Sequence, residues 1–157
     1  MGIEIRLLQR GDEAVLAHVA PEVFDEDPDA ALARQFLADP RHHLAVAVDD
    51  GVVVGFASAV DYLHPDKPSE LWINEVGVAP THRGQGLGKA VLAALFEAGR
   101  AMGCSEAWVL THRPNTAAMR LYASQGGRQS TDDEVMFTFP LSSALRTGAT
   151  DRAARDD

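Results

Sequence analysis

The residues with the clearest chemical meaning form one glycine-rich segment, Arg83-Gly84-Gln85-Gly86-Leu87-Gly88-Lys89. An apolar, strand-like run (71–78) precedes the segment, and a helical pattern of apolar residues (86–102) follows it. The start of a helix carries unpaired backbone N–H groups and the positive end of the helix dipole, which together bind phosphate. Glycine lets the backbone approach a pyrophosphate closely. The segment therefore predicts a phosphate-binding turn.

The segment departs from the two commonest phosphate motifs. The dinucleotide fingerprint requires a third glycine where Lys89 stands, and the nucleotide P-loop requires glycine where Arg83 stands and Ser or Thr where Ala90 stands. The spacing Arg-x-x-Gly-x-Gly at Arg83, Gly86 and Gly88 instead resembles the acyl-coenzyme A signature of the GNAT superfamily of N-acetyltransferases. An ordinary glycine-rich turn between a strand and a helix is the alternative.

A second pattern follows, in which Asn115, Ala118, Tyr122 and Gly126 are spaced as Asn-x-x-Ala-x-x-x-Tyr-x-x-x-Gly. This spacing resembles the second sequence pattern of the same superfamily, and the two patterns occur in the expected order. The resemblance implies an α/β (α+β) GNAT fold over residues 1–141. Its sheet would be mixed, mostly antiparallel, with about six to seven strands, splayed between the fourth and fifth, and flanked by about four helices. We expect residues 142–157 to be a disordered tail.

Local patterns give the order of elements along the chain. Asp12 and Asp29 are suited to cap two helices, and the turn Asp49-Asp50-Gly51 is suited to join a β-hairpin. Asn115 is suited to cap a helix that runs to residue 124. The expected strands are 3–7, 43–48, 52–60, 71–78, 107–111 and 134–139, and the expected helices are 12–20, 30–37, 86–102 and 115–124.

The resemblance implies acetyl-coenzyme A as the cosubstrate. Backbone N–H groups of residues 76–78 would hold the thioester carbonyl oxygen, and Gly77 is suited to a β-bulge that separates its strand from the next. Asn115 would touch the cosubstrate or serve only as a helix cap. The residues assigned to the cosubstrate are Val76, Gly77, Val78, Arg83, Gly84, Gln85, Gly86, Leu87, Gly88, Lys89, Asn115, Ala118 and Tyr122.

Two residues are predicted to move protons. An alkylamine has a pKa of about 10, so most of an amine substrate arrives protonated and needs a base. Glu75 is a carboxyl group within an apolar run, where desolvation should raise its pKa, and relatives often place the base on this strand. Tyr122 would protonate the departing thiolate. The alternatives are a structural glutamate paired with a neighbour and a tyrosine in the core.

Residues 23–78 and the stretch Glu134-Val135-Met136-Phe137 resemble the type I aminoglycoside 3-N-acetyltransferases. In that branch an acid at the position of Glu75, usually aspartate, meets the amine that is acetylated. A polycationic substrate needs a groove lined with carboxylates, and Asp61 and Asp133 are further acids available for it. The predicted substrate-binding residues are Asp25, Glu26, Asp27, Tyr62, Asn74, Glu75, Asp132 and Glu134.

Composition narrows the class of protein. A net charge of −9 disfavours nucleic acid and anionic membranes as partners and suits a cationic substrate. The single cysteine, Cys104, favours a cytoplasmic location, and the six histidines show no metal-ligand spacing, so we expect no metal. The resemblance also implies a homodimer. Two rival functions stay open: acetylation of a protein N-terminus, a lysine side chain or a polyamine, and a non-catalytic acyl-coenzyme A sensor.

Overall fold

A computed structural model of the chain describes residues 2–130 and 133–142. The chain divides into two units at Gly126, and each is described by itself. Residues 143–157, where the sequence predicts a disordered tail, lie outside the described residues, so that expectation and the expected boundary at residue 141 stay predictions.

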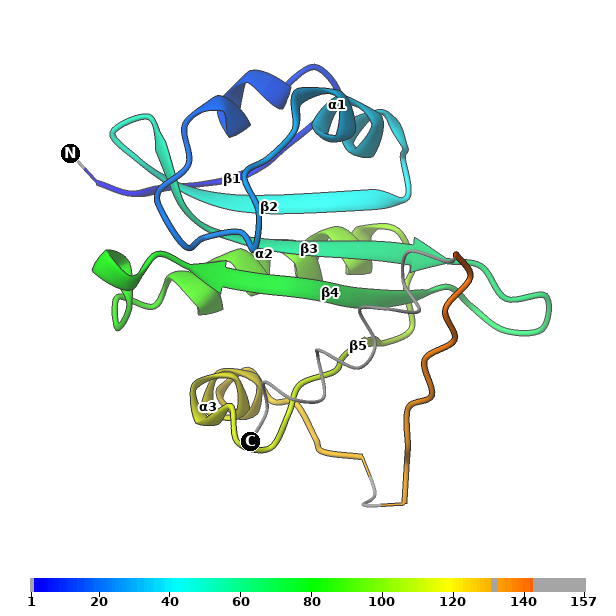
Figure 1. Cartoon of the computed structure of the whole chain (residues 1–157). Helices are drawn as coiled ribbons and strands as arrows, with labels where there is room; N and C mark the ends of the chain where they lie inside the picture. Colours follow the sequence, from blue (N-terminus) through cyan, green and yellow to red (C-terminus); the bar gives the residue numbers. More distant parts are fainter. Residues whose placement is uncertain (1, 131–132, 143–157) are drawn as a thin grey trace. The chain divides into compact units, whose positions relative to one another are not determined.

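The first unit contains one mixed sheet of five strands (Figure 1). The strands are β1 (Glu4–Leu7), β2 (His42–Asp49), β3 (Val52–Tyr62), β4 (Glu70–Val78) and β5 (Ala107–Val109), in the spatial order β1-β2-β3-β4-β5. Strands β1 to β4 pair antiparallel, and β5 pairs parallel with β4. A parallel pair needs a crossover connection, which α2 (Leu87–Ala101) supplies. The expected mixed, mostly antiparallel sheet is confirmed, with fewer strands in the described residues than the six to seven expected.

The described residues contain three α-helices, where about four helices were expected. They are α1 (Ala30–Ala38), α2 and α3 (Thr116–Ser124), and two short 3₁₀-helices, η1 (Glu13–Ala17) and η2 (Pro80–His82), accompany them. The helix expected after Asp12 is only the 3₁₀-helix η1. Asp12 makes no side-chain cap there, because its carboxylate accepts a hydrogen bond from the backbone N–H of Gln9 at 2.8 Å.

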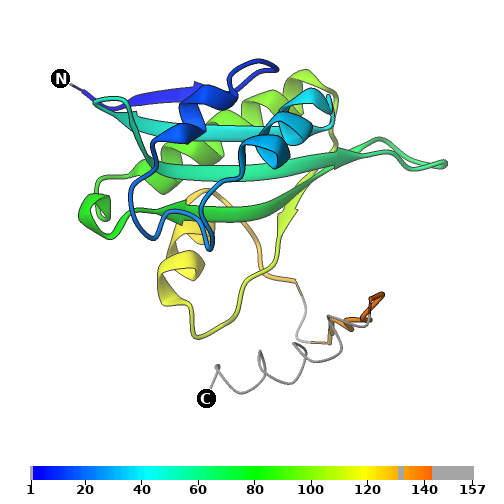
Figure 2. The same ribbon diagram turned by 45° about the horizontal axis from the view of Figure 1, so that its top comes forward.

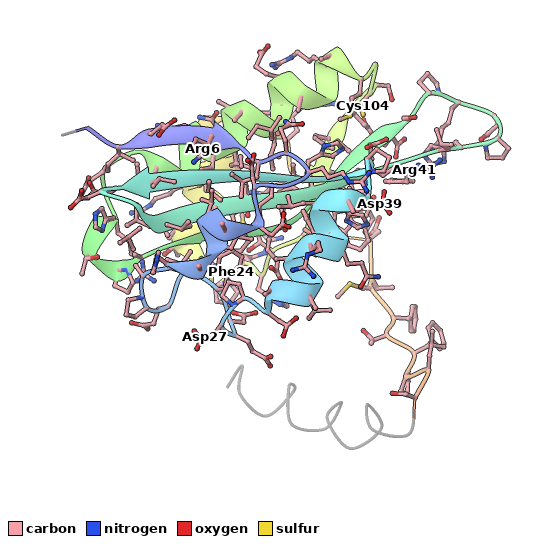
Figure 3. All side chains as sticks on the ribbon, turned by 90° about the horizontal axis from the view of Figure 1, so that it is seen from above. Arg6, Phe24, Asp27, Asp39, Arg41 and Cys104 are labelled. Carbon is pink, nitrogen blue, oxygen red and sulfur yellow. The ribbon has the colours of Figure 1, made fainter. Side chains whose placement is uncertain are left out.

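The sheet lies between helices on its two faces. Helix α2 covers one face, while η1 and α1 cover the other, as Figures 2 and 3 both show. The side chains of Leu71, Val91, Leu92 and Leu95 fill the core between the sheet and α2, and each is at most 1% exposed. In the described part of the chain, no helix is both long enough and apolar enough to cross a membrane.

Strands β4 and β5 stay together for only three residues. Leu71, Trp72 and Ile73 pair with Ala107, Trp108 and Val109, and beyond Ile73 the facing edge of β4 has no pairing with β5. The bulge between β3 and β4 falls at the same place, since Ser58 pairs with Glu75 and Ala59 with Ile73, which leaves Asn74 as the extra residue. The splay between the fourth and fifth strands thus begins at Asn74.

Gly77 is not the bulge residue that the sequence suggested, because it pairs in regular register with Phe56. A Cβ atom at Gly77 would collide with the carbonyl oxygen of Val23 and lie 2.8 Å from the Phe56 ring. Glycine at this position therefore permits the close approach of the loop that carries Val23.

The second unit, described over residues 127–130 and 133–142, contains no strand within those residues. The strand predicted at 134–139 is wrong for this structure. A strand exists only where its backbone bonds to a neighbouring strand, and alternation of apolar residues alone does not provide one. Its large apolar side chains are exposed: Val135, Met136, Phe137, Phe139 and Leu141.

Candidate active site

The glycine-rich turn between η2 and α2 has the geometry expected of a phosphate site. Gly84 and Gly86 have φ angles of 76° and 78°, in the left-handed region that favours glycine. A Cβ atom at either position would meet nothing within 4 Å, so the space beside the turn is open. The backbone can therefore be approached closely by a ligand.

The start of α2 differs from the starts of the other two α-helices. Asp29 caps α1 by accepting a hydrogen bond from the Leu32 N–H at 2.9 Å, and Asn115 caps α3 by accepting one from the Ala118 N–H at 3.1 Å. Gly86, the N-cap of α2, has no side chain to do this. The first N–H groups of the longest helix are thus available to an anion, which fits the pyrophosphate of coenzyme A.

Some of the other residues of the turn are exposed, and others pack in the protein core. Arg83, Gln85 and Lys89 are exposed and able to reach an anion. Leu87 was assigned to the cosubstrate, but its side chain is only 7% exposed and belongs to the core, so only its backbone faces outward. Gly88 lies against α3, since a Cβ atom there would be 3.1 Å from Leu121. The last glycine of the motif therefore packs two helices together.

A pocket of about 220 Å³ opens where β4 and β5 separate. Both predicted proton-transfer residues, Glu75 and Tyr122, line it, and so do five other residues predicted to bind cosubstrate or substrate. The complete lining is Val23, Asp25, Phe56, Asn74, Glu75, Val76, Leu110, Thr111, Asn115, Ala118 and Tyr122. Gly77 and Val78 continue β4 beyond the pocket towards the glycine-rich turn. The edge of β4 that faces away from β3 thus runs between the glycine-rich turn and the pocket lined by Glu75 and Tyr122.

Glu75 lies on the part of β4 that pairs with β3 but no longer with β5, in an exposed position within the open pocket. Partial burial by the surrounding protein raises the pKa of its carboxyl group above the ordinary 4.5, and the negative charge of Asp25 raises that pKa further. A carboxylate with a raised pKa is a stronger base than an ordinary one, which suits removal of a proton from an ammonium group.

Tyr122 reaches the same pocket from α3. Burial raises the pKa of its phenol above the ordinary value of 10, so the hydroxyl group remains protonated near neutral pH and can donate. Asn115 caps α3 and also lines the pocket, so its cap is confirmed and its contact with the cosubstrate stays a prediction.

The predicted substrate-binding residues lie in several places. Asp25 and Asn74 line the pocket, while Glu26 and Asp27 are exposed on the same loop as Asp25 without lining it. Figure 3 shows Asp27 and Phe24 on the α1 side of the sheet, and Cys104 on the opposite side near the end of α2. Glu134 belongs to the second unit, and Asp132 lies outside the described residues, so their roles stay predictions.

The side chains of Tyr62 and Asp61 make hydrogen bonds within the sheet. The Tyr62 hydroxyl donates to the Glu70 carboxylate at 2.8 Å and accepts from the Trp108 indole N–H at 2.7 Å. The Trp108 ring stacks on Trp72 with centroids 4.8 Å apart. Asp61 pairs with His43 at 2.6 Å. These contacts join β3, β4 and β5 and leave Tyr62 outside the pocket lining.

Sequence reasoning missed four lining residues: Val23, Phe56, Leu110 and Thr111. Phe56 stacks on Phe24 with ring centroids 3.9 Å apart, which fixes the loop between η1 and α1 over β3. Val23 and Phe56 gave no sequence signal, because they resemble ordinary core residues. Leu110 and Thr111 were expected inside the strand 107–111, but β5 ends at Val109, and Leu110 is 54% exposed just beyond it.

Comparison with known proteins agrees with this geometry. Residues 12–126 match the family described as Acetyltransferase (GNAT) family, and the chain belongs to that family. It is similar to the N-alpha-acetyltransferase RimI of Mycobacterium tuberculosis, with 31% identity over 79% of this chain and 77% of the relative. It is also similar to mycothiol acetyltransferase of Saccharopolyspora erythraea, with 28% identity over 77% of this chain and 42% of that protein.

Among solved structures, an aminoglycoside acetyltransferase from an uncultured soil metagenomic sample superposes with a TM-score of 0.74 and 26% identity. The superposition covers 90% of this chain and 100% of the other. The chain is therefore an acetyl-coenzyme A-dependent N-acetyltransferase with the GNAT fold.

Proposed function

We propose that this acetyltransferase acetylates a primary amine of a small polycationic molecule, namely the 3-amino group of an aminoglycoside. The observation that carries the proposal is the pair of carboxylates, Glu75 and Asp25, in one pocket where β4 separates from β5. An acceptor with several ammonium groups offers one to each carboxylate.

Glu75 is the base of the proposed reaction. An alkylammonium group has a pKa of about 10, so the acceptor nitrogen arrives without a free electron pair. Glu75 removes one proton, either directly or through a water molecule, and the neutral amine becomes the nucleophile. Acetyl-coenzyme A supplies the thioester carbonyl that this nitrogen attacks.

The edge of β4 that faces away from β3 and the Tyr122 hydroxyl group act on the thioester of acetyl-coenzyme A. Along residues 76–78, the backbone N–H groups that point away from β3 have no β5 partner, so they can donate to the carbonyl oxygen as it gains negative charge. Tyr122 donates its phenolic proton to the departing thiolate, for which its raised pKa keeps it protonated. Arg83 and the first N–H groups of α2 hold the pyrophosphate at the other end of the cosubstrate.

Aminoglycoside specificity is supported by the acidity of the site and by one structural relative. The chain has a net charge of −9, and Asp25 adds a second carboxylate to the pocket that contains Glu75. The superposed soil-metagenome structure is of an aminoglycoside acetyltransferase. A charged, acid-lined site attracts a polycation and orients it through more than one contact.

A second candidate is acetylation of a protein N-terminus. It is favoured by the 31% identity to a protein named as an N-alpha-acetyltransferase. The phosphate turn, Glu75 and Tyr122 would act in the same way, and only the acceptor would differ. A peptide requires room for a continuing chain, whereas an aminoglycoside requires a second anionic contact such as Asp25.

The deciding experiment follows the release of free coenzyme A thiol from acetyl-coenzyme A. The full chain would be offered gentamicin, sisomicin, kanamycin, spermidine, a lysine peptide and a peptide with a free N-terminus. Turnover confined to aminoglycosides supports the proposal, and NMR of the product then shows whether the 3-amino group carries the acetyl group. Turnover on a peptide or spermidine alone overturns the proposed acceptor.

The Glu75→Gln protein is the control in the same assay. It retains the phosphate turn but lacks the base, so thiol release that persists at the wild-type rate would overturn the assigned role of Glu75. Coenzyme A binding without turnover on any of these amines would favour the sensor that the sequence left open.

A further inference from the structure

A histidine next to the glycine-rich turn is joined to a distant part of the sheet. His82 is the last residue of η2 and directly precedes Arg83. Its Nε2 atom lies 2.8 Å from the Asp49 carboxylate, and its Nδ1 atom lies 2.8 Å from the Thr81 hydroxyl oxygen. A carboxylate only accepts, so Nε2 carries the proton and donates it to Asp49. Both ring nitrogens of His82 are therefore engaged.

Asp49 is held on a rigid support. It is the last residue of β2, and it pairs with Val52 across the hairpin turn. The two turn residues, Asp50 and Gly51, have φ angles of 48° and 79°. Positive φ angles at both central residues are the mark of a tight type I′ hairpin. The hairpin therefore offers His82 an anchor that moves little.

The contact matters because the turn itself is only loosely packed. Arg83, Gly84, Gln85 and Gly86 are all exposed, and the space beside both glycines is empty to 4 Å. At the C-terminal end of the turn, the side chain of Leu87 is only 7% exposed and packs in the core, which fixes that end. At the N-terminal end of the turn, His82 contacts Asp49 of β2, and the four exposed residues 83–86 follow directly.

We propose that His82 and Asp49 are positioning residues for the phosphate-binding turn. Neither lines the pocket that contains Glu75 and Tyr122, so their effect would reach the reaction only through the placement of the turn. Holding the end of the turn in advance lowers the conformational entropy lost when the pyrophosphate binds. The pair is partly buried, with side chains 20% and 35% exposed, which shields it from competition by water.

The proposal predicts a selective loss of affinity for coenzyme A. His82→Ala and Asp49→Ala should each raise the dissociation constant for coenzyme A, and the KM for acetyl-coenzyme A, by about tenfold. At saturating acetyl-coenzyme A, kcat should stay within about twofold of wild type, and so should the KM for the amine. The double variant should bind no more weakly than either single variant, because both changes remove the same contact.

A conservative variant and a matched control sharpen the test. In Asp49→Asn, the amide oxygen can still accept from His82, so this variant should recover much of the affinity. His43→Ala removes a comparable histidine–aspartate pair, His43 with Asp61 at 2.6 Å, which joins β2 to β3 away from the turn. This control should leave the dissociation constant for coenzyme A unchanged. Circular dichroism would establish that each variant is folded at the assay temperature.

Calorimetric titration with coenzyme A is the primary measurement, and it needs no amine. Failure of the aminoglycoside proposal would therefore leave this test intact. Wild-type affinity in both His82→Ala and Asp49→Ala would overturn the proposal. So would a fall in kcat at unchanged KM for acetyl-coenzyme A, or an equal loss of affinity in His43→Ala, since either would indicate a general structural effect.

Discussion

Asp25 and Glu75 lie on segments far apart in the sequence, yet they face one pocket closely enough for the charge of one to raise the pKa of the other. Asp25 belongs to the loop between η1 and α1, and Glu75 belongs to the part of β4 beyond its pairing with β5. Stacking of Phe24 on Phe56 fixes that loop over the sheet. The strength of the base is thus set partly by a residue that is itself available to hold a cationic acceptor.

Asp25→Asn should lower the pKa of Glu75, because it removes a negative charge that disfavours the ionised carboxylate. Burial, the larger cause of the raised pKa, stays in place, so the shift should be partial. The acidic limb of kcat/KM for the amine should move to lower pH. Asp27→Asn is the matched control, since Asp27 is exposed on the same loop and does not line the pocket. An unmoved limb in Asp25→Asn would contradict the assignment.

Glu75→Gln should reduce kcat by about 10²- to 10⁴-fold, the usual range for loss of a general base. The acidic limb of the pH profile should disappear with it. The measurement is the pH dependence of thiol release with a saturating amine. If the variant keeps both the rate and the limb, another group is the base.

The same variant should not be less stable than wild type at pH 7. The folded-state pKa of Glu75 is raised, so its contribution to stability is fully present below the ordinary pKa of 4.5 and is lost as the pH rises through the raised pKa. At pH 7 the folded state disfavours the ionised carboxylate relative to the unfolded state, and glutamine carries no charge there. Thermal unfolding at pH 4 and pH 7 would check this, and a lower Tm for Glu75→Gln at pH 7 would contradict it.

Tyr122→Phe should lower kcat, by about 10²-fold or more, and leave the dissociation constant for coenzyme A nearly unchanged. The ring still fills its place on α3, and only the proton donor is lost. In the wild type, burial holds the pKa of Tyr122 above 10, so ionisation of Tyr122 should cause no loss of activity between pH 7 and pH 9. Stopped-flow rates with saturating substrates would provide the test. An unchanged kcat would remove Tyr122 from the mechanism.

Gly77→Ala should destabilise the fold by about 1–3 kcal/mol, because the new methyl group would meet the Val23 carbonyl oxygen and the Phe56 ring. Gly55→Ala is the matched control on the adjacent strand, since its methyl group would lie 3.4 Å or more from its neighbours. Unfolding by urea would measure both free energies. Equal losses in the two variants would show that the position of Val23 does not depend on Gly77.

Helix caps, the hairpin turn and one apolar strand were predicted from the sequence, because each depends on residues close together in the chain. The caps Asp29 and Asn115, the Asp49-Asp50-Gly51 turn and the apolar run of β4 all lie where they were predicted. The helix after Asp12 shortened to a 3₁₀-helix because the Asp12 carboxylate bonds back to Gln9. Composition and periodicity do not determine which backbone N–H group the Asp12 carboxylate bonds to.

Features that depend on distant residues were not predictable in the same way. The bulge lies at Asn74 and not at Gly77 because the register with β3 and the position of Val23 decide it. Tyr62 looked like a substrate contact, but its hydroxyl bonds to Glu70 and Trp108. The contact between His82 and Asp49 joins η2 to the β2–β3 hairpin, and no local sequence pattern near either residue predicts it.

The missing side-chain cap of α2 also links the persistence of the enzyme to the metabolic state of the cell. Any ligand that binds only the folded chain stabilises it, by about 2.7 kcal/mol when its free concentration is 100 times its dissociation constant. The phosphate site proposed here would place that ligand at the first turn of α2, the helix that covers one face of the sheet. A cell rich in acetyl-coenzyme A should therefore retain more of this protein than a starved one, because less of it would be open to proteases at any moment.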